Sequence, residues 1–252
     1  MEHIFEADKR MEAVKQWRLS DSYRRLNANG VAESERMIAI GTAFYSDLEK
    51  LKAEANNRTA KTQYASGGTI HRGIYCPSPV LDLTVGKTSR GRIIKRIVNP
   101  ARVSHRFGLN AEDALLFCES FANGEQISTE YIIRQGEIQY GITVNRAGEL
   151  AAVSEEVFAQ NGIVKYTYIN IYPDGDSYFC ASVHIERIVY DDNGLISGEK
   201  DSCQPYINAF ERYRYCFERE DGFLTSYTAE EYLNDQWIKL PLVYTVRRKQ
   251  KA

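Results

Sequence analysis

Apolar residues in the first fifth of the chain recur at steps of three and four, the spacing of one helical face. One run is Ile4, Ala7, Met11, Val14 and Trp17, and a second is Met37, Ile40, Phe44, Leu48 and Leu51. Between them, Ser20-Asp21 offers a cap for a new helix, and Asn29-Gly30 favours a turn. The pattern predicts two amphipathic helices, which must pack on each other or on the segments that follow.

Residues 59–90 follow neither the helical nor the strand period and are rich in Gly, Ser, Thr and Pro. One short apolar run, Val80 to Val85, interrupts them. This composition is typical of loops and of boundaries between structural units. We therefore expect a connecting region that contains one or two strands.

From Ile93 onward apolar and polar residues alternate with the period of a β-strand. A seven-residue motif recurs in this part. It has an apolar residue, then Asn, Asp or Glu, then Gly or Asp three positions later, and a final apolar residue. Asn and Asp side chains bond to the nearby backbone, and Gly or Asp takes a positive φ, so the motif is typical of a hairpin turn. The copies are Leu109–Leu115, Val144–Leu150, Tyr190–Ile196 and Phe217–Phe223, with a looser one at Tyr172–Tyr178 and a different turn at Arg134–Glu137.

Consecutive hairpins pair strands that are neighbours in sequence, and a long meander of this kind must twist and curl. The predicted fold class is α+β, with N-terminal amphipathic helices followed by a long curved antiparallel β-meander, a half-barrel-like sheet. The helices are expected to cover one apolar face. We place a helical segment at 1–58, a connecting basic region at 59–102, the meander domain at 103–246 and a basic tail at 247–252.

Charge is strongly segregated, although the chain has a formal net charge of only −2. Residues 58–109 hold ten basic side chains against one acid, Asp82, whereas residues 110–246 hold 23 acidic and nine basic side chains. Such blocks either steer charged partners or neutralise each other within the fold. The sequence leaves both alternatives open.

Several features predict a cytoplasmic protein. The five cysteines form no Cys-x-x-Cys pair and are odd in number, so we expect reduced thiols and neither a disulfide framework nor a zinc site. The first ten residues are too highly charged for a signal peptide. No run approaches the roughly 18 apolar residues that a membrane helix requires, so we expect no membrane partner.

The segment Arg187–Ile196 reads Arg-Ile-Val-Tyr-Asp-Asp-Asn-Gly-Leu-Ile and resembles a unit of the tyrosine–aspartate (YD) repeats of bacterial Rhs-type proteins. In the other copies Phe217, Leu109 and Val144 replace the tyrosine. The resemblance covers residues 103–230 and implies a meandering sheet in a bacterial polymorphic-toxin setting. Small cytosolic meander proteins found near such toxins are often immunity proteins, so it also implies a protein-binding role.

Seven basic residues and no acid lie between Lys87 and Arg106. Glycine leaves backbone N–H groups accessible to an anion, and arginine can donate two hydrogen bonds to phosphate oxygens. This stretch is therefore a candidate nucleic-acid or nucleotide-phosphate site. It is not a Walker A loop, because no Gly lies five residues before Gly86. A solvated or internally paired basic loop is the alternative. The candidate phosphate ligands are Lys87, Arg90, Arg92, Lys95 and Arg96.

Catalytic signatures are sparse. Arg72, Ser128-Thr129-Glu130 and Glu230-Glu231 resemble the Arg, Ser-Thr-Ser and Glu-x-Glu order of ADP-ribosyltransferases, but Glu130 replaces a serine and the last two glutamates are adjacent. Glu155 and Glu156 are strand neighbours that face opposite ways, so they form no acid–base dyad. Each cysteine is flanked by apolar or aromatic residues, which favours buried structural thiols. With four scattered histidines we expect no metal, no cofactor and no catalytic residue.

Many of the 17 tyrosines fall on predicted strands. Most are expected to be cross-strand packing partners, while those that face outward on the acidic sheet would make a recognition surface. The leading hypothesis is a non-enzymatic, cytosolic binding module for a basic protein, with a bacterial toxin as the sharpest candidate. Nucleic-acid or nucleotide binding through residues 87–106 is the alternative, and an enzyme is third. The residues assigned to the protein-binding surface are Tyr166, Tyr168, Tyr190, Tyr213 and Tyr215.

Overall fold

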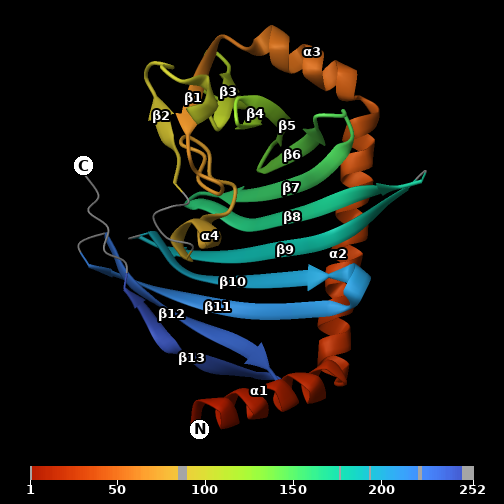
Figure 1. Ribbon diagram of the computed structural model, residues 1–252, viewed down its shortest axis with the longest axis vertical. Helices are drawn as coiled ribbons and strands as arrows, with labels where there is room; N and C mark the ends of the chain where they lie inside the picture. The colour runs from red at the N-terminus through yellow and green to blue at the C-terminus, as the bar shows by residue number, and fades with distance from the viewer. Residues whose placement is uncertain (1, 85–89, 176, 193, 221–222, 246–252) are drawn as a thin grey trace.

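The computed structural model describes residues 2–84, 90–175, 177–192, 194–220 and 223–245. In this part of the chain, four α-helices accompany one long antiparallel sheet, which confirms a mixed helix-and-sheet fold (Figure 1). The predicted basic tail and Lys87 lie outside the described residues. No described helix is long and apolar enough to cross a membrane. The helices are α1 (Glu2–Arg18), α2 (Asp21–Ser46), α3 (Leu48–Arg58) and the short α4 (Pro79–Thr84).

The predicted cap at Ser20 is confirmed. Its hydroxyl accepts the backbone N–H of Tyr23 at 3.1 Å and so satisfies one of the free donors at the start of α2. The predicted turn at Asn29-Gly30 is wrong, because both residues lie inside α2. Gly30 serves close packing instead: a Cβ there would lie 2.8 Å from Cys203 on the sheet. A glycine that usually breaks a helix is kept here because the helix backbone approaches the sheet.

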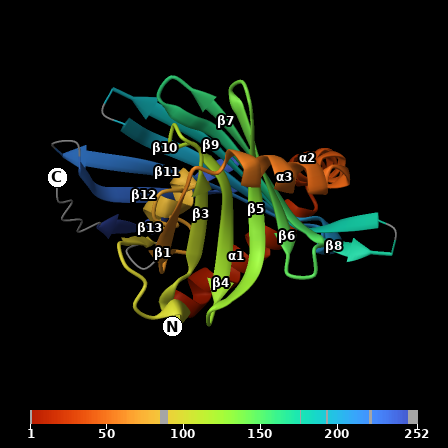
Figure 2. The same ribbon diagram turned by 90° about the horizontal axis from the view of Figure 1, so that it is seen from above.

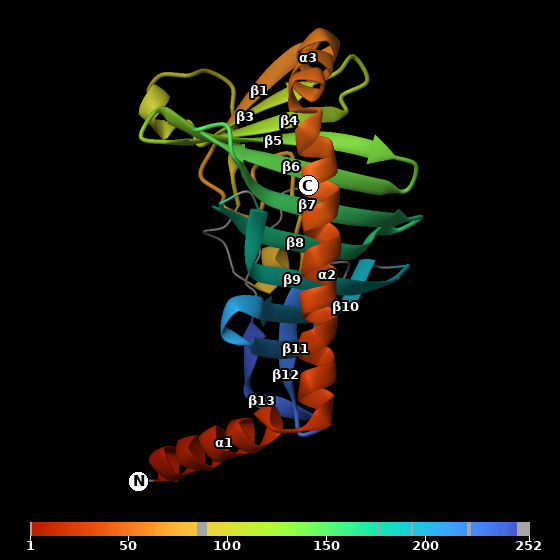
Figure 3. The same cartoon turned by 90° about the vertical axis from the view of Figure 1, so that its right-hand side faces the viewer.

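The predicted apolar face of the first helix packs only in part. Trp17 is buried and contacts the rings of Tyr23, Phe210 and Tyr232, whereas Met11 is exposed. The reason is position: Figure 3 shows α1 leaving the sheet toward its N-terminal end, while α2 lies across the strands. The second predicted face is buried at Met37 and Leu48, but it belongs to two helices and not to one, because α2 ends at Ser46 and α3 begins at Leu48.

Thirteen strands of the described chain form the sheet, in the order β13-β12-β11-β10-β9-β8-β7-β6-β5-β4-β3-β1-β2, with every neighbouring pair antiparallel. The sheet is open, with β13 and β2 at its edges. The connecting region contributes two strands that join the meander. The strands are β1 (Lys61–Ser66), β2 (Arg92–Ile94), β3 (His105–Leu109), β4 (Leu115–Ala122), β5 (Glu125–Gln135), β6 (Ile138–Asn145), β7 (Leu150–Ala159), β8 (Gly162–Asp174), β9 (Ser177–Asp191), β10 (Gly194–Gln204), β11 (Ala209–Glu220), β12 (Phe223–Leu233) and β13 (Gln236–Thr245).

The hairpin turns fall where the motif predicts them. Asn110 and Asn145 each accept a backbone N–H four residues on, at 2.8 and 3.0 Å, and the predicted positive φ occurs at Asp113 and Gly148. The copy that begins at Tyr190 joins β9 to β10. In the Phe217–Phe223 copy the two turn residues lie outside the described chain, but β11 and β12 flank them as expected. Local turn chemistry therefore determines most strand ends.

The two faces of the sheet are covered differently. On one face, α2 packs on β6 to β11, and Figure 2 shows this helix from above at one side of the sheet. The buried side chains between α2 and the strands form the largest apolar core. Glu155 lies on this side, paired with Arg36 of α2 at 2.8 Å. We call this side the helix face. On the opposite face, residues 67–84 with α4 lie against the middle of the sheet, and we call these residues the strap (Figure 1).

Candidate functional site

The five tyrosines assigned from the sequence all lie on the face opposite α2. Directly paired residues of antiparallel strands point to the same side, and the pairing forms two rows across β7 to β11. We call this side the tyrosine face. Tyr190 and Tyr215 lie on it as well, around the side chain of Val80. One row is Glu156, Tyr166, Glu186, Lys200 and Tyr213; the other is Ser154, Tyr168, His184, Ser202 and Glu211.

The strap buries part of this face. The Ser78 hydroxyl and the Val80 backbone N–H donate to the Glu186 carboxylate at 2.6 and 3.1 Å. Val80 itself fits over Gly198, where a Cβ would lie 2.4 Å from its Cγ2 atom. Tyr166 is consequently only 5% exposed. It is a core residue and is not available to a partner.

A second polar cluster lies under the strap. Arg72 of the strap donates to Glu130 on β5 at 2.5 Å, and the Tyr75 hydroxyl donates to Glu156 on β7 at 2.8 Å. Ser154 also donates to Glu130, at 3.3 Å. Burial raises the pKa of Glu156 to about 8. The buried His105 has a pKa lowered to about 4, chiefly by burial and then by the Arg72 cation.

This cluster brings together two of the three motifs that resemble ADP-ribosyltransferases. Arg72 and Glu130 are in contact, but Glu231 lies on β12, where it binds Arg10 at 2.7 Å. The three motifs therefore do not meet in one cleft. Arg72, Tyr75 and Ser154 instead hold the buried carboxylates, and the contacts fasten the strap to the sheet. Glu155 and Glu156 face opposite sides, as predicted.

The described residues contain no group of three or more His, Cys, Asp or Glu side chains that could hold a metal ion. Among the cysteines, Cys118, Cys180 and Cys203 are buried as predicted. Cys216 is exposed, which corrects the prediction. The reason is alternation on β11: Tyr215 and Phe217 point to the core under α4, so the residue between them points the other way.

Exposed aromatic residues continue the tyrosine face toward the β8–β9 hairpin. The rings of Tyr172 and Phe179 stack with their centroids 5.6 Å apart, and the ring centroid of Tyr206 lies 6.0 Å from that of Phe179. Tyr206 is 83% exposed, and its neighbour Ile207 is exposed as well. We call Tyr172, Phe179 and Tyr206 the aromatic cluster. The looser turn motif that begins at Tyr172 predicts the β8–β9 hairpin, but it does not predict that the aromatic side chains beside the turn are exposed.

Half-buried side chains join the aromatic cluster to the rest of the face. The ring of Tyr168 stacks on those of Tyr166 and His184, each at 6.4 Å. The Tyr168 hydroxyl donates to Asn170 at 2.8 Å, and Asn170 donates to Ser182 at 3.0 Å. Burial lowers the pKa of His184 to about 4, so this imidazole is neutral at pH 7. The surface is aromatic, neutral and held in place by hydrogen bonds.

Many of the acidic residues have partners within the fold. The buried Asp201 accepts from Arg187 at 2.9 Å and from Arg212 at 2.6 Å, and Glu199 accepts from Arg214 at 3.0 Å. The basic block is also paired in part: Arg72, Arg90 and Arg106 bind Glu130, Asp82 and Glu119. Of these pairs, Arg72–Glu130 and Arg106–Glu119 join the basic block to the acidic region, whereas the others lie within one block, so internal neutralisation accounts for only part of the segregated charge.

The candidate phosphate ligands do not form one described site. Lys87 lies outside the described residues, and Arg90 is engaged with Asp82. Arg92, Lys95 and Arg96 are more exposed and follow one another along the chain at the edge of the sheet.

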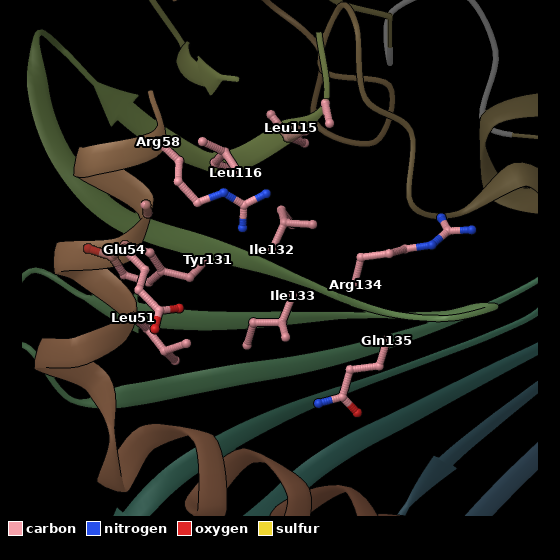
Figure 4. Close-up of a pocket in the computed structure, with 12 residues that line it drawn as sticks. Leu51, Glu54, Arg58, Leu115, Leu116, Tyr131, Ile132, Ile133, Arg134 and Gln135 are labelled. Atoms are coloured by element: carbon pink, nitrogen blue, oxygen red, sulfur yellow. The ribbon is translucent and has the colours of Figure 1, made fainter. Parts of the chain in front are cut away.

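A separate cavity of about 310 Å³ lies between α3 and strands β4 and β5 (Figure 4). Figure 4 shows Leu51, Glu54 and Arg58 of α3 on one side and Tyr131 and Ile133 of β5 on the other. Its volume is at the lower end of the range for small-molecule pockets. Its lining combines aliphatic side chains with Glu54, Arg58, Arg134 and Gln135 and contains neither histidine nor cysteine.

No protein-family model matches the chain, and no curated protein matches its sequence.

Proposed function

We propose that this protein is a non-enzymatic, cytoplasmic binding module for a basic protein, and that its half-barrel-like sheet receives the partner on the uncovered part of the tyrosine face. The observation that carries the proposal is the aromatic cluster. Large exposed aromatic side chains that already pack on one another lose little rotamer entropy on binding and are typical anchors of protein interfaces.

Charge supports a basic partner. Asp174 follows Tyr172 on β8, and Glu211 ends the row that contains Tyr168 and His184. Both carboxylates are exposed, and neither forms an ion pair with another described residue. Unpaired carboxylates at the rim of an aromatic surface would speed the approach of a cationic partner and fix its orientation.

Immunity to a bacterial toxin is the most specific form of this proposal. It rests on the resemblance of Arg187–Ile196 to YD repeats and on the meander that carries this segment.

The test is affinity capture from the native cytosol with the wild type and the double variant Phe179→Ser, Tyr206→Ser. A genuine partner should bind the wild type and lose roughly 5- to 150-fold in affinity for the variant, which corresponds to about 1–3 kcal/mol for an aromatic anchor. Val189→Ser is the matched control, since Val189 is exposed on the same strand as Phe179 but on the helix face. Capture that depends equally on Val189, or not at all on the aromatic cluster, would contradict the proposal.

A further inference from the structure

Residues 92–102 project from the edge of the sheet in an ordered conformation, and we call these residues the basic loop. Its first residues are the edge strand β2, where Ile94 pairs with Tyr64. Its last residues form a 3₁₀ turn that the Asn99 side chain caps by accepting the Ala101 N–H at 3.0 Å. Val103, which follows, is buried. Figure 3 shows this part of the chain, in yellow, projecting from the sheet on the side away from α2.

The basic loop carries four exposed cations: Arg92, Lys95, Arg96 and Arg102. None forms an ion pair with a carboxylate in the part of the chain that the structure describes. The arginines on either side behave differently, because Arg90 and Arg106 bind Asp82 and Glu119. The fold thus neutralises the flanks of the basic block and leaves its projecting part charged.

Aliphatic side chains are interleaved with these cations. Val98 is 85% exposed, and Ile93 and Ile97 are exposed as well. No Phe, Tyr or Trp occurs between residues 92 and 102. A projecting surface that combines unpaired cations with exposed aliphatic groups suits an anionic membrane surface, which has negatively charged headgroups above a hydrocarbon layer.

We propose that the basic loop attaches the protein to membrane surfaces that contain anionic phospholipids, with the cations on the headgroups and Val98 and its neighbours in the acyl boundary. Single-stranded nucleic acid is a poorer match, because its bases stack on aromatic side chains, which the loop lacks. The proposal departs from the sequence-based expectation of no membrane partner, because that expectation rested on the lack of a spanning segment and surface attachment needs none. This attachment is independent of the protein-binding function proposed for the tyrosine face.

The test is co-sedimentation of the full chain with phosphatidylcholine vesicles that contain or lack phosphatidylglycerol. Binding should require phosphatidylglycerol and weaken as salt rises. Each cation contributes about fivefold to partitioning, so the variant with Arg92, Lys95, Arg96 and Arg102 all changed to Ala should bind at least a hundredfold more weakly. Val98→Ser should also weaken vesicle binding, while its binding to duplex DNA or RNA stays at the wild-type level. Val98→Trp should bind more tightly, and its emission should shift to the blue on the vesicles.

Exposed cations elsewhere provide the control. The triple variant Arg18→Ala, Arg25→Ala, Lys50→Ala removes three exposed charges from α1, α2 and α3 and should bind vesicles like the wild type. All substituted residues are on the surface, and thermal melts should confirm that every variant is folded. The proposal is overturned if anionic vesicles do not bind at low salt, if Val98→Ser binds them unchanged, or if the control loses as much binding as the loop variant. Tighter binding to nucleic acid than to vesicles would assign the loop to the alternative partner and equally overturn it.

Discussion

Glu156 should make the protein less stable as the pH rises. Its carboxyl is buried beneath the strap, and its pKa is raised from 4.5 to about 8, first by burial. The folded state therefore keeps a proton that the unfolded state releases, so stability falls between pH 4.5 and 8. One pKa unit corresponds to about 1.4 kcal/mol, so this single group contributes a loss of about 5 kcal/mol across that range.

Urea unfolding followed by circular dichroism at pH 6.5 to 9, for the wild type and Glu156→Gln, measures this effect. The amide oxygen of glutamine can still accept the Tyr75 hydroxyl, and glutamine does not titrate. The decline in unfolding free energy should be much smaller in the variant.

Glu137→Gln is the control, since Glu137 is an exposed carboxylate in the turn between β5 and β6. It should keep the wild-type pH dependence. A Glu156→Gln variant whose stability declines as steeply as the wild type would refute the reasoning, and so would a wild type whose stability does not change over this range.

Three other outcomes are expected from stability measurements. Tyr166→Ala should lower the free energy of unfolding by about 3–5 kcal/mol, because it removes a buried ring, whereas Tyr206→Ala should change it by less than about 0.5 kcal/mol. Thermal melts of the two variants measure this difference, and equal losses would contradict the assigned burial. Gly198→Ala should lower the free energy of unfolding by about 1–3 kcal/mol, because the added methyl group forces Val80 of the strap away from the sheet. Chemical denaturation measures this loss, and an unchanged unfolding midpoint would show that Val80 does not pack on Gly198. His184 should act in the opposite direction from Glu156 as the pH drops from 6.5 toward 4, because its depressed pKa means that the unfolded state binds the proton first. Relative to the wild type, His184→Gln should therefore gain stability over this range in urea unfolding, and an unchanged difference between the two proteins would count against it.

Local chemistry made the meander predictable. The Asn110 and Asn145 turns depend on side-chain bonds to the backbone a few residues away, so the sequence motif contains the whole interaction. Gly30 shows the opposite case. Glycine commonly marks a turn, but Gly30 lies within α2, where its lack of a side chain allows close packing against Cys203, a residue far away in the sequence. The candidate site divides in the same way. Alternation placed Tyr166 and Tyr168 on one face correctly, but only one of them is buried deeply.

The sequence by itself determined the cap at the start of α2, the ends of most strands and the side of the sheet to which each strand residue points. These properties follow from interactions within a few residues. The tertiary structure alone decided which side chains are accessible and which charges are paired, because the strap reaches β5, β7 and β9 from dozens of residues away. Burial beneath it made Tyr166 a core residue and raised the pKa of Glu156, while Tyr206 and Val98 remained exposed. Burial and ion pairing depend on long-range contacts, and no local pattern encodes them.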